Sequence, residues 1–317
     1  MKILCIGMMV CDTLISPVPF NILKLDSVKI NKPSICCGGD ALNVAMGLAI
    51  LNHQVLIAGR IADDANGRFI LAECEKKGVD TSGIIFDKEC ATAASYALID
   101  EDGERHFLTE KAIFERLEGK DVTDEELQKA DIIYFGSAMA MHRMDEGGIE
   151  DIFKRAHALG KLTAMDAAIN REDADRDWLA FLAPALKETD IFFPSLREAE
   201  KITKETEPEK IMEYFRPFSM KLFGIKLGGR GCFVTDFKES RYIPCPDGMP
   251  VVDTTGAGDS FMAGLLCGMA HGWSPFDSAE FAGCVATKNV GAMGGTAGIP
   301  DFDEALHFYQ TYRNKER

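Results

Sequence analysis

The chain has 317 residues, 46% of them hydrophobic and 27% charged, which is typical of a folded globular protein and argues against a disordered one. The formal net charge of −15 makes nucleic acid an unfavoured partner, because the average field of the protein repels a polyanion. The ten cysteines form no C-x-x-C pair and the apolar runs are shorter than the roughly 18 residues of a membrane span, so we expect reduced thiols in a cytoplasmic protein with no membrane partner.

Short apolar runs alternate along the chain with longer segments of helical periodicity. The runs predict strands at residues 2–6, 55–58, 132–135, 162–166, 191–194, 222–227 and 231–235. The periodic segments predict helices at residues 41–51, 67–77, 147–159, 177–186 and 260–271. Such alternation is typical of a mainly parallel sheet with helices on both faces, so the expected fold is a three-layer α/β/α sandwich.

Two segments, residues 13–38 and 91–109, interrupt this alternation. The first shows little helical periodicity, and the second contains Glu101-Asp102-Gly103 between two β-like runs, which is typical of a hairpin. We predict that both form a small β-sheet that lies as a lid over a site at the carboxyl ends of the main strands. The alternative is a surface hairpin without a functional role. No clear linker divides the chain, so residues 1–317 are expected to form a single domain with this lid inserted in it.

The most informative segment is residues 253–260, which read Asp-Thr-Thr-Gly-Ala-Gly-Asp-Ser and lead directly into a predicted helix. Gly256, Ala257 and Gly258 bring backbone N–H groups to a helix N-terminus, where these groups and the helix dipole favour an anion. Asp259 follows in the first turn, where its carboxylate can accept a proton from a substrate hydroxyl as a general base. The alternative is an ordinary capped helix, but the whole segment favours the catalytic interpretation.

Residues 253–259 resemble the C-terminal signature of the ribokinase family, also called the PfkB carbohydrate kinases. Residues 38–43, Gly-Gly-Asp-Ala-Leu-Asn, together with residues 59–67 are similar to the second signature of that family, with Ala62 where glycine is usual. The two signatures lie near opposite ends of the chain, so the resemblance spans nearly all of it. It implies a ribokinase-like fold and an ATP- and Mg²⁺-dependent kinase that phosphorylates a hydroxyl of a sugar or sugar acid, of the fructose, ribose or 2-keto-3-deoxygluconate type.

The resemblance also implies roles on the substrate side. It places Asp12, Gly38, Gly39 and Asn43 against the sugar, where a carboxylate accepts hydrogen bonds from vicinal hydroxyls and an amide both donates and accepts. The alternative for Asp12 is an ordinary turn aspartate, and the alternative for Asn43 is a helix residue that points to water. Asp40 stands where ribokinase itself tends to have lysine, which argues against ribose as the substrate.

On the nucleotide side, the resemblance implies contacts from Ser195, Lys226, Gly228, Gly231 and Gly283. It also implies that Glu198 organises Mg²⁺ through water. The family usually has asparagine at position 195, and serine has a shorter reach. The alternatives are an exposed first helical turn for Glu198 and a plain hairpin turn for residues 226–231. Residues 166–171, Asp-Ala-Ala-Ile-Asn-Arg, resemble an Asp-x-Asn-x-Arg element of fructokinase-like members, but their spacing differs from it by one position.

A monovalent-cation site is a further implication of the resemblance. It implies that K⁺ is held by Asp253 and by groups at Thr255, Asn289, Ala292 and Gly294, and that this cation polarises the anion-hole loop. Backbone ligands leave no sequence pattern, so the expectation rests on the resemblance alone. Exposed lid strands can also pair across a two-fold axis, so a homodimer through the lid is expected.

Other classes of protein fit the sequence less well. A Rossmann dehydrogenase needs Gly-x-Gly-x-x-Gly after the first strand, and this chain lacks that motif. The chain also contains neither a P-loop nor an H-E-x-x-H motif. Two alternatives stay open. One is a nucleoside kinase of the same family, in which a lid aromatic such as Tyr96 or Phe107 stacks on a base. The other is a non-catalytic sugar-binding regulator on the same fold.

Overall fold

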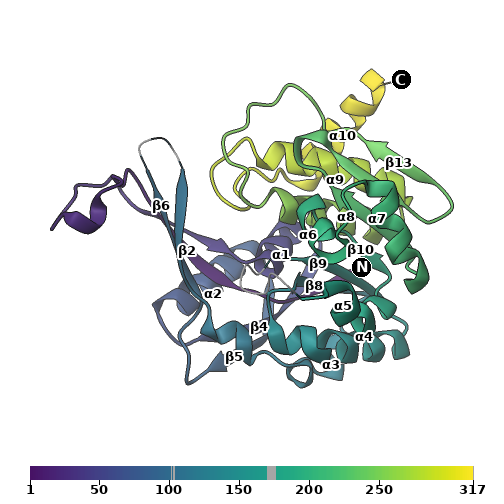
Figure 1. Cartoon of the computed structure of the whole chain (residues 1–317), viewed down its shortest axis with the longest axis horizontal. Helices are drawn as coiled ribbons and strands as arrows, with labels where there is room; N and C mark the ends of the chain where they lie inside the picture. The colour runs from purple at the N-terminus through teal and green to yellow at the C-terminus, as the bar shows by residue number, and fades with distance from the viewer. Residues whose placement is uncertain (101, 103, 170–175, 317) are drawn as a thin grey trace.

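A computed structural model of the chain describes residues 1–100, 102, 104–169 and 176–316. Its central element within these residues is a nine-stranded sheet (Figure 1). The strands from β11 to β5 run parallel, and β12 and β13 pair antiparallel at one edge. The spatial order is β13 (Ser240–Ile243), β12 (Cys232–Thr235), β11 (Leu222–Lys226), β10 (Ile191–Phe192), β9 (Leu162–Ala167), β8 (Ile132–Ala138), β1 (Lys2–Ile6), β4 (Gln54–Ala62) and β5 (Asp80–Asp87).

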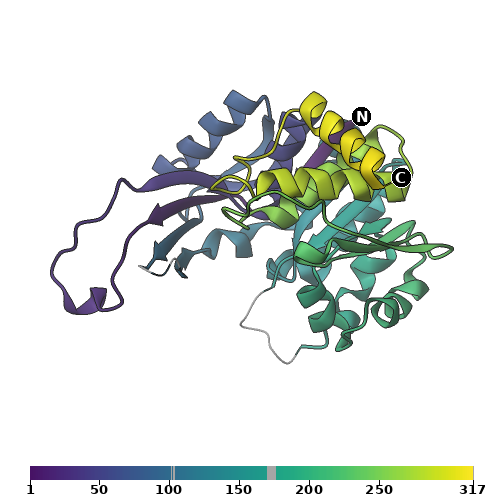
Figure 2. The ribbon, with the colours of Figure 1, turned by 90° about the horizontal axis from the view of Figure 1, so that it is seen from above.

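Helices cover both faces of this sheet, as the alternating pattern predicts (Figure 2). One face carries α1 (Asp40–Ile50), α2 (Ala65–Lys77), α8 (Ala257–Ala270), α9 (Pro275–Asn289) and α10 (Phe302–Glu316). The other face carries α3 (Asp124–Gln128), α4 (Ile149–Ala158), α5 (Trp178–Lys187), α6 (Leu196–Thr203) and α7 (Pro208–Phe215). The fold is therefore a three-layer α/β/α sandwich.

Strand β1 illustrates why the apolar runs become inner strands. Ile3 and Cys5 enter the core beneath the first group of helices, whereas Leu4 and Ile6 enter the core beneath the second. Because successive side chains of a strand point to opposite faces, a sheet covered on both faces needs an uninterrupted apolar run. All four side chains are fully buried. This pattern fits the position of β1 between β4 and β8.

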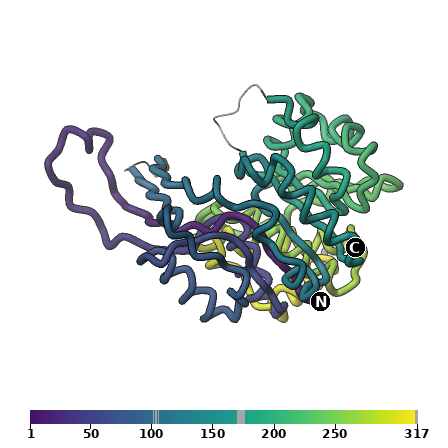
Figure 3. The backbone as a smooth tube through the Cα atoms, turned by 90° about the horizontal axis from the view of Figure 1, so that it is seen from below, coloured from purple at the N-terminus to yellow at the C-terminus, as the bar shows by residue number. Residues whose placement is uncertain are grey.

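A second sheet of four strands projects from the main body, away from both chain ends (Figures 1 and 3). We call it the small sheet; its spatial order is β3 (Ser34–Gly38), β2 (Val10–Ile15), β6 (Ala94–Ile99) and β7 (Arg105–Glu110). Strands β2 and β6 pair in parallel, and β3 and β7 join them antiparallel at the two edges. The antiparallel pair β6–β7 agrees with the predicted hairpin, whose tip residues 101 and 103 lie outside the described residues.

Each predicted strand and helix coincides with an element of the structure, with ends that differ by a few residues. The helix predicted at residues 147–159 begins at Ile149, because a π-helical turn at Met144–Gly148 precedes it. Elements β5, β13, α3, α7, α9 and α10 have no counterpart among the elements predicted from the sequence, where α6 appears only as the alternative helical turn at Glu198. Among the described helices, none is both long enough and apolar enough to span a lipid bilayer.

Candidate active site

The start of α8, the turn predicted to act as an anion hole, lies at the carboxyl edge of the main sheet. Gly256 precedes the helix with a φ of 71°, in the left-handed region that favours glycine. A Cβ at Gly256 would also overlap the carbonyl oxygen of Gly295, so the turn has room only for glycine. The N–H groups of Gly258 and Asp259 belong to the first helical turn, which offers them no intrahelical acceptor. These groups can therefore bind an anion.

Asp259 lies in this first turn and faces the start of α1. Its Oδ2 accepts a hydrogen bond of 2.7 Å from Asn43 Nδ2. Burial raises the pKa of Asp259 above its ordinary value, while the bond from Asn43 and the positive charge of Lys226 act against that rise. A carboxylate with a raised pKa beside an anion hole has the properties of a general base.

Gly39 joins the small sheet to α1 and sets the position of Asn43. It is the N-cap of α1 with a φ of 86°, and a Cβ there would collide with the backbone of Met8. The Asn43 N–H donates to the Gly39 carbonyl at 2.9 Å, one helical turn along. Asn43 Oδ1 is buried without a hydrogen-bond partner among the described groups. The structure therefore brings Gly39, Asn43 and Asp259 together and leaves a buried acceptor beside them.

Asp12 lies in β2, at the junction of the small sheet with the main body. Its carboxylate packs directly against Gly38, where a Cβ would collide with Asp12 Oδ2. Burial raises the pKa of Asp12 to about 6, and a hydrogen bond with Ser95 opposes this rise. Gly38 thus makes room for a carboxylate next to the turn at Gly39.

Asp40 and Ser137 form a second polar pair, to which the sequence analysis assigned no site role. Asp40 Oδ1 accepts hydrogen bonds from Ser137 Oγ at 2.5 Å and from the Ala41 N–H at 2.7 Å. Asp40 Oδ2 is buried and has no hydrogen-bond partner within the described part of the chain. Burial, together with the charge of Asp259, raises the pKa of Asp40 to about 7. A second unsatisfied acceptor therefore lies within electrostatic reach of Asp259.

Lys226 and Asp166 form a buried ion pair between the ends of β11 and β9. Burial alone would lower the pKa of Lys226, but the carboxylates of Asp166 and Glu198 outweigh this effect and hold the pKa above its ordinary value. The ammonium group also approaches the anion hole, since a Cβ on Gly258 would lie 3.4 Å from Lys226 Nζ. A positive charge therefore stands beside the first turn of α8.

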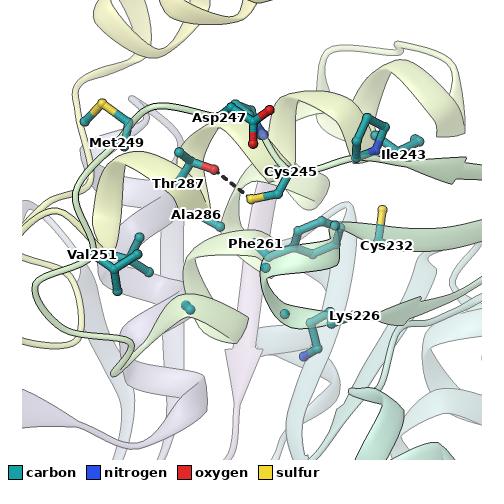
Figure 4. Close-up of a pocket in the computed structure, with 18 of the residues that line it drawn as sticks. Lys226, Cys232, Ile243, Cys245, Asp247, Met249, Val251, Phe261, Ala286 and Thr287 are labelled. Carbon is teal, nitrogen blue, oxygen red and sulfur yellow. Dashed lines mark hydrogen bonds between the residues drawn. The ribbon is translucent and has the colours of Figure 1, made fainter.

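A cavity of about 350 Å³ extends from Lys226 along α8 and α9 (Figure 4). Its wall is largely apolar, with Phe261 and Val251 among the lining side chains, and Cys245 Sγ lies 3.1 Å from Thr287 Oγ1 at one side. The residues of this wall that the sequence analysis singled out are Lys226, Gly228, Gly231, Ala257, Gly258 and Gly283. The structure therefore brings most of the expected nucleotide residues to one cavity.

Ser195 is not among the residues that line this cavity. It caps α6 instead, where its N–H donates to Glu198 Oε2 at 2.7 Å and its Oγ accepts from the Glu198 N–H at 3.4 Å. A β-bridge also pairs Ser195 with Lys226. Ser195 therefore positions Glu198 and the end of β11.

Two loops meet behind the anion hole. Asp253 Oδ1 accepts from the Thr255 N–H at 2.9 Å, and Asp253 Oδ2 accepts from the Gly294 N–H at 3.0 Å. The fully buried Asn289 donates from Nδ2 to the Gly256 carbonyl at 3.4 Å and to a carbonyl of its own loop at 2.9 Å. The side chains expected at a cation site thus connect the loop at residues 253–256 to the loop at residues 289–295.

The segment at residues 166–171 contains a site residue that its weak motif did not identify. Asp166 is the partner of Lys226, while Asn170 and Arg171 lie outside the described residues. The signal that identifies Asp166, as well as Ser137, is its position near the end of an apolar strand. The carboxyl ends of parallel strands meet at one edge, which is where ligands of open α/β sheets bind.

Comparison with known proteins identifies the family of the chain. The family profile described as pfkB family carbohydrate kinase matches residues 1–301. Fructokinase-1 from Oryza sativa subsp. japonica is 30% identical over 241 residues, which are 72% of this chain and 72% of that protein.

Two solved structures share the fold. A putative ribokinase II from E. coli in complex with ATP and Mg²⁺ has a TM-score of 0.84 at 21% identity, over 98% of this chain and 99% of the other. A fructokinase double mutant from Vibrio cholerae O395, in its form with fructose, ADP and potassium ion bound, has a TM-score of 0.80 at 20% identity, over 97% and 98% of the two chains. The expected fold and family are confirmed: the chain belongs to the pfkB family of carbohydrate kinases and is a sugar kinase.

Proposed function

We propose that this sugar kinase transfers the γ-phosphate of ATP to a hydroxyl of a sugar or sugar acid, with Asp259 as the general base. The hydrogen bond between Asn43 and Asp259 is the observation that carries the proposal, because it holds a base with a raised pKa at the start of α8, beside the anion hole. The likeness to a rice fructokinase favours a ketohexose of the fructose type within this class.

Asp259 accepts the proton of the attacking hydroxyl. Asn43 and Lys226 both favour the ionised form of the carboxylate, which counteracts the rise in pKa that burial causes. Negative charge on the transferring phosphoryl group is stabilised by the N–H groups of Gly258 and Asp259, at the positive end of the α8 dipole. ATP, when bound, supplies the phosphoryl group.

The cavity beside α8 suits an adenine nucleotide. Its apolar wall can take a base, and its end at Lys226 presents an ammonium group to the phosphates. Gly228 and Gly283 leave space at that wall: no described atom lies within 4 Å of a Cβ at Gly228, and a Cβ at Gly283 would lie 3.9 Å from Pro246. Gly231 has a different role, since a Cβ there would overlap the carbonyl oxygen of Ile243. We assign Lys226 to the terminal phosphates, with Asp166 holding the ammonium group in position.

Glu198 is the residue that we assign to Mg²⁺. Its Oε2 accepts the Ser195 N–H, and we assign Oε1 to a water ligand of the ion. Glu198 also interacts electrostatically with Lys226 and Asp166, which agrees with a position at the phosphate end of the cavity. Mg²⁺ would neutralise phosphate charge there.

K⁺ is proposed to bind where the loop at residues 253–256 meets the loop at residues 289–295. Asp253, Thr255, Asn289 and Gly294 all lie in this junction. A cation held by its carbonyl oxygens would add positive charge behind the anion hole and would keep the turn at Gly256 in place.

Asp12, Gly38, Gly39 and Asn43 are proposed to contact the sugar, and we add Asp40 to this set. Asp40 Oδ2 and Asn43 Oδ1 are both buried without a hydrogen-bond partner among the described groups. An unsatisfied buried acceptor costs free energy, so hydroxyl groups that donate to these two oxygens would bind favourably. Acceptors of this kind favour a neutral, hydroxyl-rich sugar over a sugar acid.

The small sheet is proposed to act as a lid and as a dimer interface. The register places Ile35, Thr13, Tyr96 and Leu108 in one row across its four strands. Three of these side chains are exposed, namely Ile35 at 55%, Tyr96 at 39% and Leu108 at 61%. Asp12 lies on the opposite face, because successive residues of a strand alternate. One face can therefore cover the sugar while the apolar row meets a second copy of the chain.

An ADP-release assay over a panel of acceptors tests the proposed function. Purified protein with ATP, Mg²⁺ and K⁺ is supplied in turn with fructose, ribose, 2-keto-3-deoxygluconate and nucleosides. We expect ADP release that depends on the acceptor, with fructose-type ketoses preferred. Turnover only with a nucleoside, or sugar binding without turnover on every acceptor, would contradict the proposal.

A further inference from the structure

Three potential metal ligands lie together far from the sugar and nucleotide residues. They are His53, Cys267 and His271, and their ligand atoms all lie within 4.8 Å of one another. We propose that this cluster binds a thiophilic divalent transition-metal ion of the Zn²⁺ type, with one thiolate and two imidazole ligands and water in the fourth position. Neither the kinase reaction nor its cofactors require this ion.

The fold brings these ligands to the edge of the sheet opposite the kinase site. Cys267 and His271 come from the last turn of α8 and its C-cap, and their spacing of four residues puts them on one helix face. His53 comes from the turn that joins α1 to β4. Asp259 lies in the first turn of α8, roughly 12 Å away from Cys267 along the axis, so the two sites are separate.

His53 carries the most specific evidence for a ligand. Its Nε2 is buried and has no hydrogen-bond partner among the described groups, although a buried polar atom of this kind is normally satisfied. The ring also makes a hydrogen bond with the Met1 backbone. An imidazole nitrogen without a hydrogen-bond partner can offer its lone pair to a metal ion, which binds the neutral ring.

The other two ligands have defined surroundings. The His271 ring stacks on Phe302, with 4.8 Å between centroids, and on Trp273, with 5.6 Å. Cys267 is fully buried. A thiol binds a metal ion as the thiolate, so the ion must displace the thiol proton, which Zn²⁺, Co²⁺ or Ni²⁺ can do and which the hard ions Mg²⁺ and Ca²⁺ do not.

The surroundings favour a cation and give it access. The C-terminal ends of α1 and α8 both reach the cluster, and the negative ends of helix dipoles attract positive charge. A cavity of about 540 Å³ opens beside it and is lined by both histidines and by Asp131. The positive charges at this rim are the amino group of Met1 and Lys2, and Lys2 Nζ pairs with Asp80 at 3.2 Å.

To bind a metal ion, the three ligand atoms must move slightly closer together. Tetrahedral zinc with bond lengths of about 2.0–2.3 Å sets its ligand atoms roughly 3.3–3.7 Å apart. Atoms within 4.8 Å of one another reach that spacing if the side chains move by about 1 Å in total. The exposed His271 can make such a movement, because its ring lies at the rim of the cavity.

Cobalt substitution of the full chain tests the site directly. Protein treated with a chelator and then dialysed is titrated with Co²⁺ and, separately, with Zn²⁺. We expect one ion per chain, a thiolate-to-cobalt charge-transfer absorption, and loss of that absorption when Zn²⁺ displaces Co²⁺. Cys267→Ala should abolish the charge-transfer absorption, whereas His53→Gln and His271→Gln should each weaken binding at least about tenfold.

Matched variants separate this site from adventitious binding. Cys284→Ala removes an equally buried thiol from the neighbouring α9, and His307→Gln removes a histidine from α10; both should bind Co²⁺ like the unmodified protein. Kinase turnover without added transition metal reports that each variant is folded. No charge-transfer absorption in the unmodified protein, or an unchanged absorption in Cys267→Ala, would overturn the proposal. So would unchanged affinity in His271→Gln, whose exposed side chain can be replaced with little risk to folding.

Discussion

Asn43 and Asp259 lie 216 positions apart in the sequence and share a hydrogen bond of 2.7 Å between Nδ2 and Oδ2. The bond connects the starts of α1 and α8, the two helices whose N-terminal turns frame the candidate active site. It has a chemical consequence, since a donor to a carboxylate stabilises the ionised form and lowers the pKa. Asn43 is therefore expected to set the pH range in which Asp259 acts as a base.

Asn43→Ala should move the acid limb of the pH profile of kcat/KM to higher pH. The variant loses the hydrogen bond that lowers the pKa of Asp259, so that pKa rises further above its ordinary value. A base must be ionised to act, and activity is lost as the pH falls through its pKa, so a higher pKa moves the loss upwards. Gln128→Ala, which changes an exposed amide of α3, is the control. An acid limb at the same pH in both variants would contradict the role of Asn43.

Lys226→Met should raise the KM for ATP at least about tenfold, because a charge-assisted hydrogen bond to phosphate is worth more than about 1.4 kcal/mol. The single variant also leaves Asp166 buried without its partner, which can destabilise the fold. The double variant Lys226→Met/Asp166→Asn removes both charges and should recover thermal stability without recovering ATP affinity. Lys238→Met, at an exposed turn, is the control. A KM for ATP within twofold of the unmodified protein would exclude Lys226 from the phosphate site.

Replacing K⁺ by Na⁺ at constant ionic strength should lower the rate several-fold. The proposed site lies where Asp253 and Asn289 join two loops behind the turn at Gly256, so the smaller ion would hold that turn less well. Initial rates of ADP release in the two salts, with Mg²⁺ held constant, measure the effect. Equal rates in K⁺, Na⁺ and tetramethylammonium would contradict the proposed K⁺ site.

Leu108→Asp should convert a dimer into a monomer. Leu108 is 61% exposed and stands at the end of the apolar row across the small sheet, where a carboxylate would have to be desolvated against a second copy. Sedimentation or light scattering measures the mass. Phe86→Asp, at an exposed aromatic of β5 outside the small sheet, should leave the dimer intact. A monomeric unmodified protein would contradict the proposed interface.

The spacing of apolar residues predicted those strands and helices that are buried in the core. The uninterrupted apolar run of β1 and the periodicity of α1 follow from burial against both layers, so they were predictable. Strand β13 has mostly exposed residues and leaves no apolar run, so the sequence did not predict it. Helix α9 carries a Ser274 cap followed by Pro275, which is a start signal that can be read from the sequence.

In the candidate site, too, some residues could be predicted from the sequence and others could not. Gly256, Gly39 and Asp259 occur in short motifs whose local geometry the sequence determines. The ion pair of Lys226 with Asp166 cannot be predicted in this way, because the two residues are 60 positions apart and meet only when β9, β10 and β11 assemble. The same holds for Asp40 and Ser137, which meet through the neighbouring packing of α1 and β8.

The most direct test of the central claim is the turnover number of Asp259→Asn on the best acceptor of the panel. Asp277→Asn is the matched control, since Asp277 is a first-turn aspartate of α9 that interacts with the Ser274 cap and lies outside the site. We predict that Asp259→Asn lowers kcat at least about 100-fold while ATP binding is retained, and that the control keeps its rate. Turnover by Asp259→Asn within a few-fold of the unmodified protein would contradict Asp259 as the general base.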